Sequence, residues 1–316
     1  MTKGCDGSEF SRNAMKVTVL YGGPSAERDV SLVSGKAVIE GLRSMGHDVF
    51  PSDVSPTDLS GLDKPCDVIF PVLHGEFGES GELQEILEQR KLPFVGSGSR
   101  ASRLGMDKAA TKQAWERAGL PTPPYRVVTS TSDSIPEEPC VVKALDSGSS
   151  IDVYVCKAGP EGLPLGARDA IAKVLARHGR ALVEKFIAGP ELTVGLIEEQ
   201  PLAPIRIVPK AEFFDYDAKY KSKETEHRFN TGLSDALIER CKSLAKQAND
   251  LIGCRDLARV DIMIDEATQQ PYLLEINTLP GFTPVSLLPE AAKHAGIDFG
   301  PLVDRLVRRA AARGAA

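Results

Sequence analysis

The sequence predicts an α/β fold divided into three units, with a parallel sheet in the first of them. Between residues 16 and 96, short apolar runs alternate with stretches whose apolar residues recur at helical spacing. This alternation is typical of a parallel sheet covered by helices. New units begin near Gly96 and near Gly189, and 316 residues are enough for two or three domains with their own cores.

In the first unit the pattern predicts strands at Lys16–Tyr21, Asp67–Leu73 and Leu92–Val95, and a helix near Glu82–Gln89. A further helix follows the first strand, because apolar residues recur there at helical spacing: Val30, Val33, Ala37, Val38, Leu42 and Met45. The Gly pair after the first strand resembles a dinucleotide-binding turn but lacks its full spacing, so alone it is weak evidence for a nucleotide.

In the second unit, Asp107 is the expected N-cap of a helix that runs through Ala118 and is closed by Gly119. The remaining predicted elements of the second and third units are the strands Cys140–Leu145, Ile151–Cys156, Ala181–Phe186, Leu192–Ile197 and Ala203–Val208, and a helix around Ala167–Arg177. A polar loop from Glu212 to Gly232 precedes a long helix that ends at Gly253.

The stretch Leu257–Thr283 carries the strongest chemical signal. Two alternating segments flank a polar turn, and folding them into a hairpin centred near Thr268 sets Asp261 opposite Glu275. Because side chains alternate along strands, Arg259, Asp261, Glu275 and Asn277 are expected on one face, with Leu274 and Ile276 on the other. Two carboxylates and an amide oxygen suit Mg²⁺ or Mn²⁺. The alternative is a solvated hairpin face, but the neighbouring guanidinium and the Pro280-Gly281 loop favour a metal-phosphate site.

Composition narrows the class of protein. The net charge of −6 disfavours a nucleic-acid binder, and with 42% hydrophobic residues no apolar run approaches membrane-spanning length. The six cysteines are scattered without metal-ligand spacing, which favours idle thiols in a reducing cytoplasm. Residues 1–14 lack the apolar core of a signal peptide, so we expect a disordered extension, and Met15 is a possible alternative start.

Several residues could hold a phosphate, although the chain has no GxxxxGK[ST] loop. Lys143 lies in a strand that otherwise has a buried pattern, and a buried ammonium needs an anion; an outward-pointing lysine on an edge strand is the alternative. The small-residue turn Ser147–Ser150 could cover phosphate oxygens or be an ordinary loop. Lys108 sits in the first turn of its helix, where a cation opposes the helix dipole. The strand edge around Glu184 and Phe186 suits an adenine ring.

Taken together, these motifs resemble the ATP-grasp ligases, and specifically the D-alanine–D-alanine ligase family, from residue 16 to about residue 290. The matching segments are GGPSAERDVSLVSG at 22–35, HGEFGESGELQ at 74–84, VGSGSRASRLGMDK at 95–108, VVKALDSGSS at 141–150, LVEKFIAGPELTV at 182–194, DYDAKY at 215–220, GCRDLARVDIMID at 253–265 and LLEINTLPGFTPVSLLP at 273–289. Their number and order make the resemblance specific. It implies a three-domain ATP-grasp fold: a Rossmann-like domain at 15–96 and α+β subdomains at 97–188 and 189–316.

The resemblance also implies roles for individual residues. The residues expected to contact ATP are Lys108, Lys143, Glu184, Lys185, Phe186, Ile187, Glu191 and Lys219. Asp261, Glu275 and Asn277 would bind two Mg²⁺ or Mn²⁺ ions. The first of two D-alanine molecules would meet Glu27 and His74, and the second would meet Ser286 and the Leu287 backbone. Arg259 and the Gly281 N–H would stabilise an oxyanion, while Ser149 and Tyr220 would join Glu27 in fixing a closing loop. A homodimer is also implied.

The chain departs from the family pattern at a few positions. Ala144 and Asp152 replace a proline and a glycine, and a carboxylate near a triphosphate is repulsive unless it turns outward or binds metal. We therefore expect Asp152 to weaken ATP binding. The closing loop has Phe229-Asn230-Thr231-Gly232 where a Pro-Ala pair is common, and His227 is expected to be a solvated residue rather than a specificity switch. Tyr220 favours a dipeptide product; D-serine or D-lactate as second substrate, or an ATP-binding homologue with weak ligase activity, are the alternatives.

Overall fold

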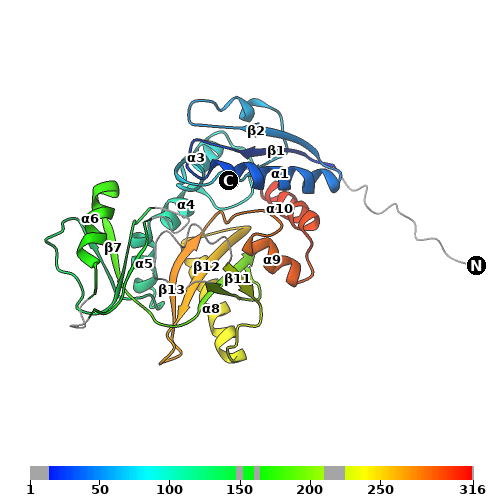
Figure 1. Ribbon diagram of the computed structural model, residues 1–316. Coiled ribbons are helices and arrows are strands. Elements are labelled where there is room, and N and C mark those ends of the chain that lie inside the picture. Colours follow the sequence, from blue (N-terminus) through cyan, green and yellow to red (C-terminus); the bar gives the residue numbers. More distant parts are fainter. Residues whose placement is uncertain (1–13, 147–151, 160–163, 210–224, 315–316) are drawn as a thin grey trace, which may run out of the picture.

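A computed structural model describes residues 14–146, 152–159, 164–209 and 225–314. Its first unit is a parallel sheet with strand order β2-β1-β3, made of β1 (Lys16–Tyr21), β2 (Asp48–Asp53) and β3 (Val68–Pro71) (Figure 1). The accompanying helical elements are α1 (Arg28–Ser44), the short η1 (Ser60–Asp63), α2 (Glu76–Glu79), α3 (Glu82–Gln89) and α4 (Ser99–Met106). This unit confirms the predicted parallel sheet.

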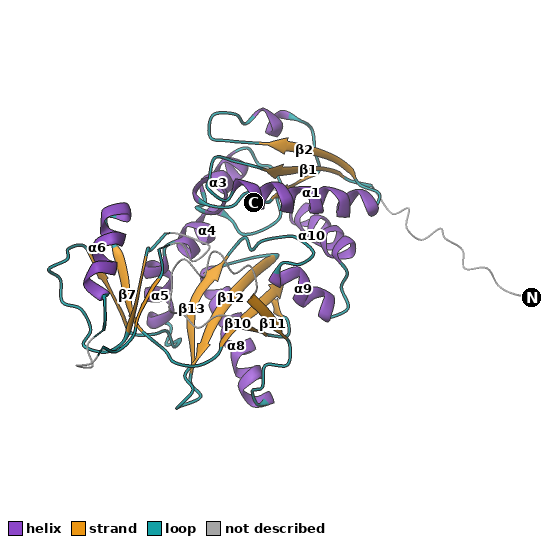
Figure 2. Cartoon of the chain, in the orientation of Figure 1, coloured by secondary structure: helices purple, strands orange, loops and turns teal. Residues whose placement is uncertain are grey.

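The second unit is a four-stranded antiparallel sheet that lies at one end of the molecule (Figures 1 and 2). Its strand order is β4-β7-β5-β6, with β4 (Tyr125–Val128), β5 (Cys140–Lys143), β6 (Tyr154–Cys156) and β7 (Ala181–Lys185). Helix α6 (Ala167–His178) packs its buried face on β5 and β7. Helix α5 (Lys108–Arg117) leads into the unit, and the Asp107 carboxylate caps it by accepting from the Ala110 N–H at 2.9 Å, as predicted.

The third unit is built on a larger antiparallel sheet with the order β11-β10-β8-β12-β13. Its strands are β8 (Glu191–Ile197), β9 (Gln200–Pro201), β10 (Ile205–Pro209), β11 (Thr225–Arg228), β12 (Leu257–Ile264) and β13 (Pro271–Asn277), with β9 paired to β8. The helices are α8 (Asp235–Ile252), α9 (Leu287–His294) and α10 (Phe299–Arg313). Alternation along β8 assigns its two faces: Leu192, Val194 and Leu196 join the core under α8, whereas Thr193 and Gly195 face the other way.

The C-terminal segment returns to the first sheet. Helix α10 packs against α1 and β3, and its apolar residues share one core with β1 and β3 (Figure 1). Phe282, which follows β13, lies between Phe70 and Phe299 with both ring-centroid distances at 5.6 Å. The loop after β13 is therefore held against the first unit by a buried aromatic cluster.

Most predicted elements are present, and the differences have local causes. In place of the strand predicted at Leu92–Val95 there is an isolated parallel bridge between Ile69 and Phe94. The strand at Asp48–Asp53 was not predicted, because its alternation is broken by Pro51. Of the strand predicted from Ile151, the described part is Tyr154–Cys156. The expected extension and the loop from Glu212 lie largely outside the described residues.

A buried carboxylate joins the first unit to the third. Asp256 is fully buried with φ at +66°, and its oxygens accept from the Gly96 N–H at 2.8 Å and from Arg313 at 2.6 and 2.9 Å. Arg309 adds a contact at 3.2 Å. Because Asp256 joins the backbone at Gly96 to two arginines of α10, this carboxylate fixes how the last helix docks on the domain junction.

We predict that Asp256→Ala lowers the free energy of unfolding by about 3 kcal/mol, because it leaves arginine charges and a buried N–H without their acceptor. Asp256→Asn keeps an acceptor and tolerates the positive φ, so a smaller loss is expected. Asp250→Asn, which removes an exposed ion pair with Lys246, is the matched control and should change stability by less than about 0.5 kcal/mol. Urea unfolding measures all three variants, and equal effects at positions 256 and 250 would contradict the prediction.

Candidate functional site

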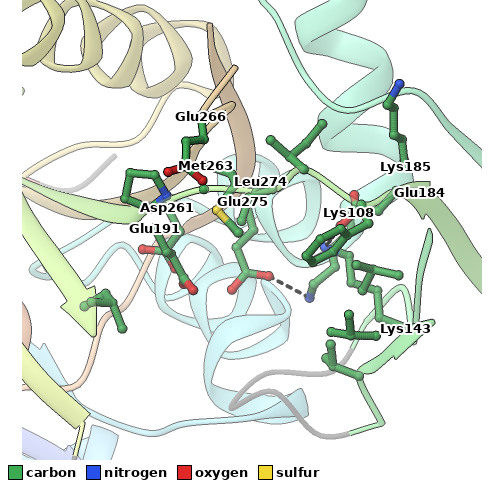
Figure 3. A pocket seen from close by; sticks show the side chains of 18 of the residues that line it. Lys108, Lys143, Glu184, Lys185, Glu191, Asp261, Met263, Glu266, Leu274 and Glu275 are labelled. Atoms are coloured by element: carbon green, nitrogen blue, oxygen red, sulfur yellow. Dashed lines mark ion pairs between the residues drawn. The ribbon is translucent and has the colours of Figure 1, made fainter. Parts of the chain in front are cut away.

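A cavity of about 480 Å³ lies between the four-stranded sheet and the larger sheet (Figure 3). Residues of β5 and β6 form one wall, and residues of β8, β10, β12 and β13 form the other. The segment after β7, with Phe186 and Ile187, closes one side. This volume is in the range of roughly 300–1,000 Å³ that is usual for small-molecule sites. The cavity has an apolar part, with Val141, Val155, Phe186, Met263 and Leu274, and a charged part, with Lys108, Lys143, Asp261 and Glu275.

The charged part contains a buried carboxylate between two lysines. Lys143 Nζ lies 2.6 Å from Glu184 Oε1, and Lys112 Nζ lies 2.9 Å from Glu184 Oε2. Lys112 also donates to the Thr122 hydroxyl at 2.6 Å, and that hydroxyl donates to the Leu273 carbonyl at 2.8 Å. The anion that Lys143 meets in this structure is therefore a carboxylate of its own sheet, on the neighbouring strand β7.

Burial and charge oppose each other in this cluster. Burial lowers the pKa of Lys112 to about 8, and Glu184 only partly offsets the effect. Burial also disfavours charge on Glu184 and on Lys143, but here the ion pairs prevail. They hold the pKa of the Glu184 carboxyl below its usual value and the pKa of Lys143 above it. Lys112 is thus the residue of this cluster whose ammonium loses its proton most readily.

The hairpin of β12 and β13 has the predicted register. Asp261 lies opposite Glu275, and Arg259 lies opposite Asn277. The register shifts between Asp261 and Ile262, which leaves Leu274 as the extra residue of a bulge. The expectation that Leu274 faces away from Glu275 is therefore wrong: both line the cavity, because the bulge interrupts the alternation.

The hairpin charges are held in place by hydrogen bonds. Arg259 donates to the two oxygens of Asp261 at 3.0 and 2.9 Å, and the Thr193 hydroxyl donates to the same carboxylate at 2.6 Å. Despite burial, which acts in the opposite direction, the carboxylates around Arg259 raise its pKa. Burial likewise opposes ionisation of Glu275, but Lys108, 3.5 Å away, Lys143 and Arg259 lower its pKa to about 2. Glu275 is therefore a carboxylate at neutral pH.

A smaller cavity of about 40 Å³ connects this face to the first unit. It is lined by Glu275, Asn277 and Lys108 from one side and by Glu79 from the other. Glu79 pairs with His74 Nδ1 at 2.8 Å, while the buried Nε2 of His74 has no hydrogen-bond partner among the described residues. The amide oxygen of Asn277 accepts from the Leu279 N–H at 3.0 Å. Asn277 thus borders the smaller cavity and not the larger one.

Glu27 is brought close to His74 by the glycine that follows the histidine. A Cβ on Gly75 would lie 3.5 Å from Glu27 Oε2 and 2.6 Å from the Ser25 Cβ. The Ser25 hydroxyl donates to the His74 carbonyl at 2.6 Å and accepts from the Glu27 N–H at 3.2 Å. Glycine at this position, with φ at +81°, therefore permits the two loops to approach.

The predicted residues after β13 lie at the start of α9. Ser286 is its N-cap residue, and its hydroxyl contacts the Thr283 hydroxyl at 2.8 Å and accepts from the Thr283 N–H at 3.0 Å. A Cβ on Gly281 would lie 3.5 Å from the Ser286 hydroxyl, so these two positions adjoin. Leu287 is the first residue of the helix.

Other predicted residues lie at the cavity margin or outside the described chain. Lys185 lines the cavity, but its ammonium pairs with Glu138 at 2.9 Å. Glu191 and Ile187 line the cavity as well. Ser149, Lys219 and Tyr220 lie outside the described residues.

The structure places the Asp152 carboxylate outside the cavity. Its side chain is buried, its carboxylate accepts from Arg177 at 2.6 Å and contacts His178 Nε2 at 2.9 Å, and it does not line the cavity. The carboxylate points toward α6, where a guanidinium offsets its charge, which is the outward orientation that would relieve repulsion of a triphosphate; its effect on ATP binding stays a prediction. The sequence could not show this, because Arg177 lies twenty-five positions away.

The sequence reasoning missed the contributions of Lys112, Met263 and Arg206. Lys112 lies four residues after Lys108 and therefore on the same face of α5, a spacing that could have identified it. Met263 and Arg206 line the cavity but carry no signal in the sequence beyond their positions in strands. Among the described residues no helix is long and apolar enough to cross a membrane.

Comparisons with known proteins agree with this geometry. Residues 114–308 match the family model described as D-ala D-ala ligase C-terminus, and residues 52–97 match D-ala D-ala ligase N-terminus. A D-alanine–D-alanine ligase from Gluconobacter oxydans is 43% identical over 309 residues, covering 95% of this chain and 100% of the relative. One from Ectopseudomonas mendocina is 43% identical over 295 residues, covering 91% and 92%.

Solved structures show the same similarity. The Bacillus anthracis D-alanine–D-alanine ligase aligns with a TM-score of 0.81 at 30% identity and covers 95% of this chain and 98% of its own. Its complex with ATP aligns with a TM-score of 0.80 at 29% identity and the same coverage. The fold and the cleft between the two antiparallel sheets define an ATP-grasp enzyme. Within that class, the chain belongs to the D-alanine–D-alanine ligase family.

The lowered pKa of Lys112 predicts a pH-dependent stability. Between its folded value of about 8 and the ordinary 10.5, the unfolded chain binds more protons at this site. The free energy of unfolding contributed by Lys112 should therefore rise with pH across that window, by at most about 1.4 kcal/mol per pH unit. The measurement is the difference in unfolding free energy between the unaltered protein and Lys112→Met from pH 7.5 to 10.5. A flat or falling difference would contradict the assignment.

A second prediction distinguishes a structural role of Asp152 from an effect of its carboxylate on ATP binding. Because Arg177 and His178 hold its carboxylate outside the cavity, Asp152→Asn should leave the affinity for ATP within about twofold while lowering the unfolding midpoint. Isothermal titration with an ATP analogue and thermal unfolding measure the two effects. A severalfold gain in affinity would restore the idea that this carboxylate repels the triphosphate.

Proposed function

We propose that this chain ligates two D-alanine molecules to D-alanyl-D-alanine with ATP, through an acyl-phosphate intermediate, for peptidoglycan precursor synthesis. The observation that carries the proposal is the continuity of the cleft. The larger cavity is lined by apolar side chains, by Lys108 and Lys143 and by Asp261 and Glu275, and the smaller cavity shares Lys108 and Glu275 with it. From there the smaller cavity leads to Glu79 and its partner His74 in the first unit. A nucleotide and an amino acid can therefore meet at the hairpin.

ATP would lie in the larger cavity. Phe186, Ile187 and Met263 offer apolar surface to the adenine, and Glu191 lies where a carboxylate can meet the ribose hydroxyls. Glu184 and Lys185 border the same end. Lys108 and Lys143 would contact phosphate oxygens, together with Lys219. Both lysines are held by carboxylates in this structure, so phosphate binding would exchange or share these ion pairs.

The donor atoms on the hairpin fit hard divalent cations. Asp261 and Glu275 supply carboxylate oxygens and Asn277 an amide oxygen, with no sulfur or imidazole among them. These residues would hold two Mg²⁺ or Mn²⁺ ions. When bound, the ions offset the charge of the phosphates and of the attacking carboxylate.

The chemistry of the residues matches the two-step reaction. Glu27 would bind the ammonium of the first D-alanine, with the His74 imidazole nearby, whose Nε2 no described residue contacts by a hydrogen bond. The carboxylate of this D-alanine attacks the γ-phosphorus, and the bond to ADP breaks. The amine of the second D-alanine attacks the acyl carbon and loses a proton as phosphate leaves.

Two donors are proposed for the second step. Arg259 and the Gly281 N–H would stabilise the tetrahedral oxyanion, a contribution of about 3 kcal/mol for such a donor. Ser286 and the Leu287 N–H at the start of α9 would bind the carboxylate of the second D-alanine. Ser149 and Tyr220 would help to close the site against water, because an acyl phosphate hydrolyses readily.

We also infer a homodimer in the cytoplasm. Val30 and Val33 on α1 are 49% and 59% exposed, and a second copy packed on α1 would cover them. The described cysteines are all free thiols, which suits a reducing compartment. Size-exclusion chromatography with light scattering tests the dimer, and a monomer at micromolar concentration would contradict it.

The proposed activity is tested by ADP release with and without D-alanine, and by chromatography of the product. We expect D-alanine-dependent release, and D-alanyl-D-alanine as the main product when D-serine and D-lactate compete. Glu275→Gln should lower kcat by at least about a hundredfold, because it removes a carboxylate from the reacting face. Glu239→Gln on the exposed side of α8 is the control and should retain full activity. ATP binding without D-alanine-dependent turnover would overturn the proposal.

A further inference from the structure

Helix α9 is held from two sides. On its inner side Leu288 and Ala291 are buried against β8, where Gly195 leaves room for them: a Cβ on Gly195 would lie 2.7 Å from Leu288 Cδ1. The helix has only eight residues and would be unstable in isolation, so its orientation depends on such contacts. The inner packing also includes α10, because Leu288 and Ala292 belong to the core that α10 shares with β1 and β3, and such apolar contacts are not directional.

The outer side of α9 is held by polar and aromatic contacts with the end of β11. His227 Nδ1 lies 2.6 Å from Glu290 Oε2, and the rings of Phe229 and His294 stack with centroids 3.8 Å apart and planes 7° apart. Glu290 and His294 are four residues apart and therefore share a helix face. His227 lies in β11 and Phe229 directly follows the end of that strand, so one short segment reaches two successive turns of α9. Two matched pairs restrict tilt in a way that one contact cannot.

The strand that provides these contacts is itself anchored. His227 lies opposite Ile207 in the register of β11 with β10, and β10 continues the sheet to β8. Arg206 on β10 donates to the Thr231 carbonyl at 3.0 Å, which holds the turn after Phe229. The side chain of Arg206 also lines the larger cavity. Helix α9 is thus connected to the sheet that also forms one wall of the larger cavity.

The contact reaches the start of α9 within one helical turn. The Glu290 N–H donates to the Ser286 carbonyl at 2.9 Å, so a displacement of Glu290 moves the N-cap residue. Ser286 is fixed on its other side only through Thr283 in the preceding loop, among its described contacts. The direction in which the Ser286 hydroxyl and the Leu287 N–H point therefore depends on what holds Glu290.

We propose that His227 and Phe229 are positioning residues for the second substrate, acting through Glu290 and His294 on the start of α9. This inference rests on the proposed function, in which Ser286 and Leu287 bind the carboxylate of the second D-alanine. It replaces the expectation that His227 is solvated, since the imidazole is engaged with Glu290. It also gives a purpose to Phe229, which lies where the family commonly differs.

The test is steady-state ADP release by the full chain over a wide range of D-alanine concentrations, which yields separate Michaelis constants for the two D-alanine sites. We expect His227→Ala and Glu290→Ala each to raise the constant for the second site about three- to tenfold, since a partly exposed charged hydrogen bond is lost. The constants for ATP and for the first D-alanine should stay within about twofold. Glu290→Gln, which retains an acceptor, should recover most of the loss, and the double variant should be no worse than either single one.

The matched control is Arg228→Ala. Arg228 lies between His227 and Phe229 on the opposite face of the strand and pairs with Glu226, so its removal disturbs β11 without touching α9. It should leave all three Michaelis constants unchanged. Thermal unfolding of each variant reports whether the helix is merely destabilised.

The outcomes separate the two proposals. An active unaltered protein whose variants keep the second-site constant unchanged, or raise all three constants equally, overturns the positioning role alone. An unaltered protein with no D-alanine-dependent release overturns the proposed function and this inference with it. A selective rise at the second site, rescued by Glu290→Gln and absent in Arg228→Ala, supports the positioning role.

Discussion

The site depends on one constraint: charges buried between two sheets must balance. Glu184 is only 3% exposed and meets two ammonium groups, of which one, on Lys112, comes from α5 and the other from β5. An unpaired charge at this depth would cost several kcal/mol, so the cluster stabilises only the arrangement in which α5, β5 and β7 come together. The hairpin follows the same rule, with Asp261 paired to Arg259 and Glu275 beside Lys108. The charges of the site are therefore already oriented by one another.

A second organising feature is that the C-terminal part of the chain packs against the N-terminal sheet. Helix α10 completes the core of the first sheet, Phe282 joins the same aromatic cluster, and Asp256 ties the backbone at Gly96 to Arg313. The loop that leads to Ser286 is consequently held between the first and third units. Glu27 in the first unit and Ser286 in the third are far apart in the sequence, and these contacts hold their two units together. The contacts of His227 and Phe229 extend this bracing to the far side of α9.

Much of the site could be predicted from sequence because its residues lie in regular elements. The alternation of β12 and β13 was sufficient to pair Asp261 with Glu275, and the capping pattern was sufficient to start α5 at Lys108. The bulge at Leu274 was not predictable, because a hydrophobic residue there satisfies both the regular and the bulged register. The role of Lys112 was not predictable either, because its buried charge depends on Glu184, which lies on a strand much later in the chain.

Local periodicity and ordered motifs were enough to predict the fold class, the family and the kinds of side chain that form the site. Tertiary structure alone decided which charges pair, since ion pairs join residues whose separation in the chain carries no pattern. In the folded chain Asp152 pairs with Arg177 outside the larger cavity, and His227 contacts Glu290 on α9. In each case the reason is the same: the energy of a charge depends on what surrounds it in space, and neighbours in space are set by packing.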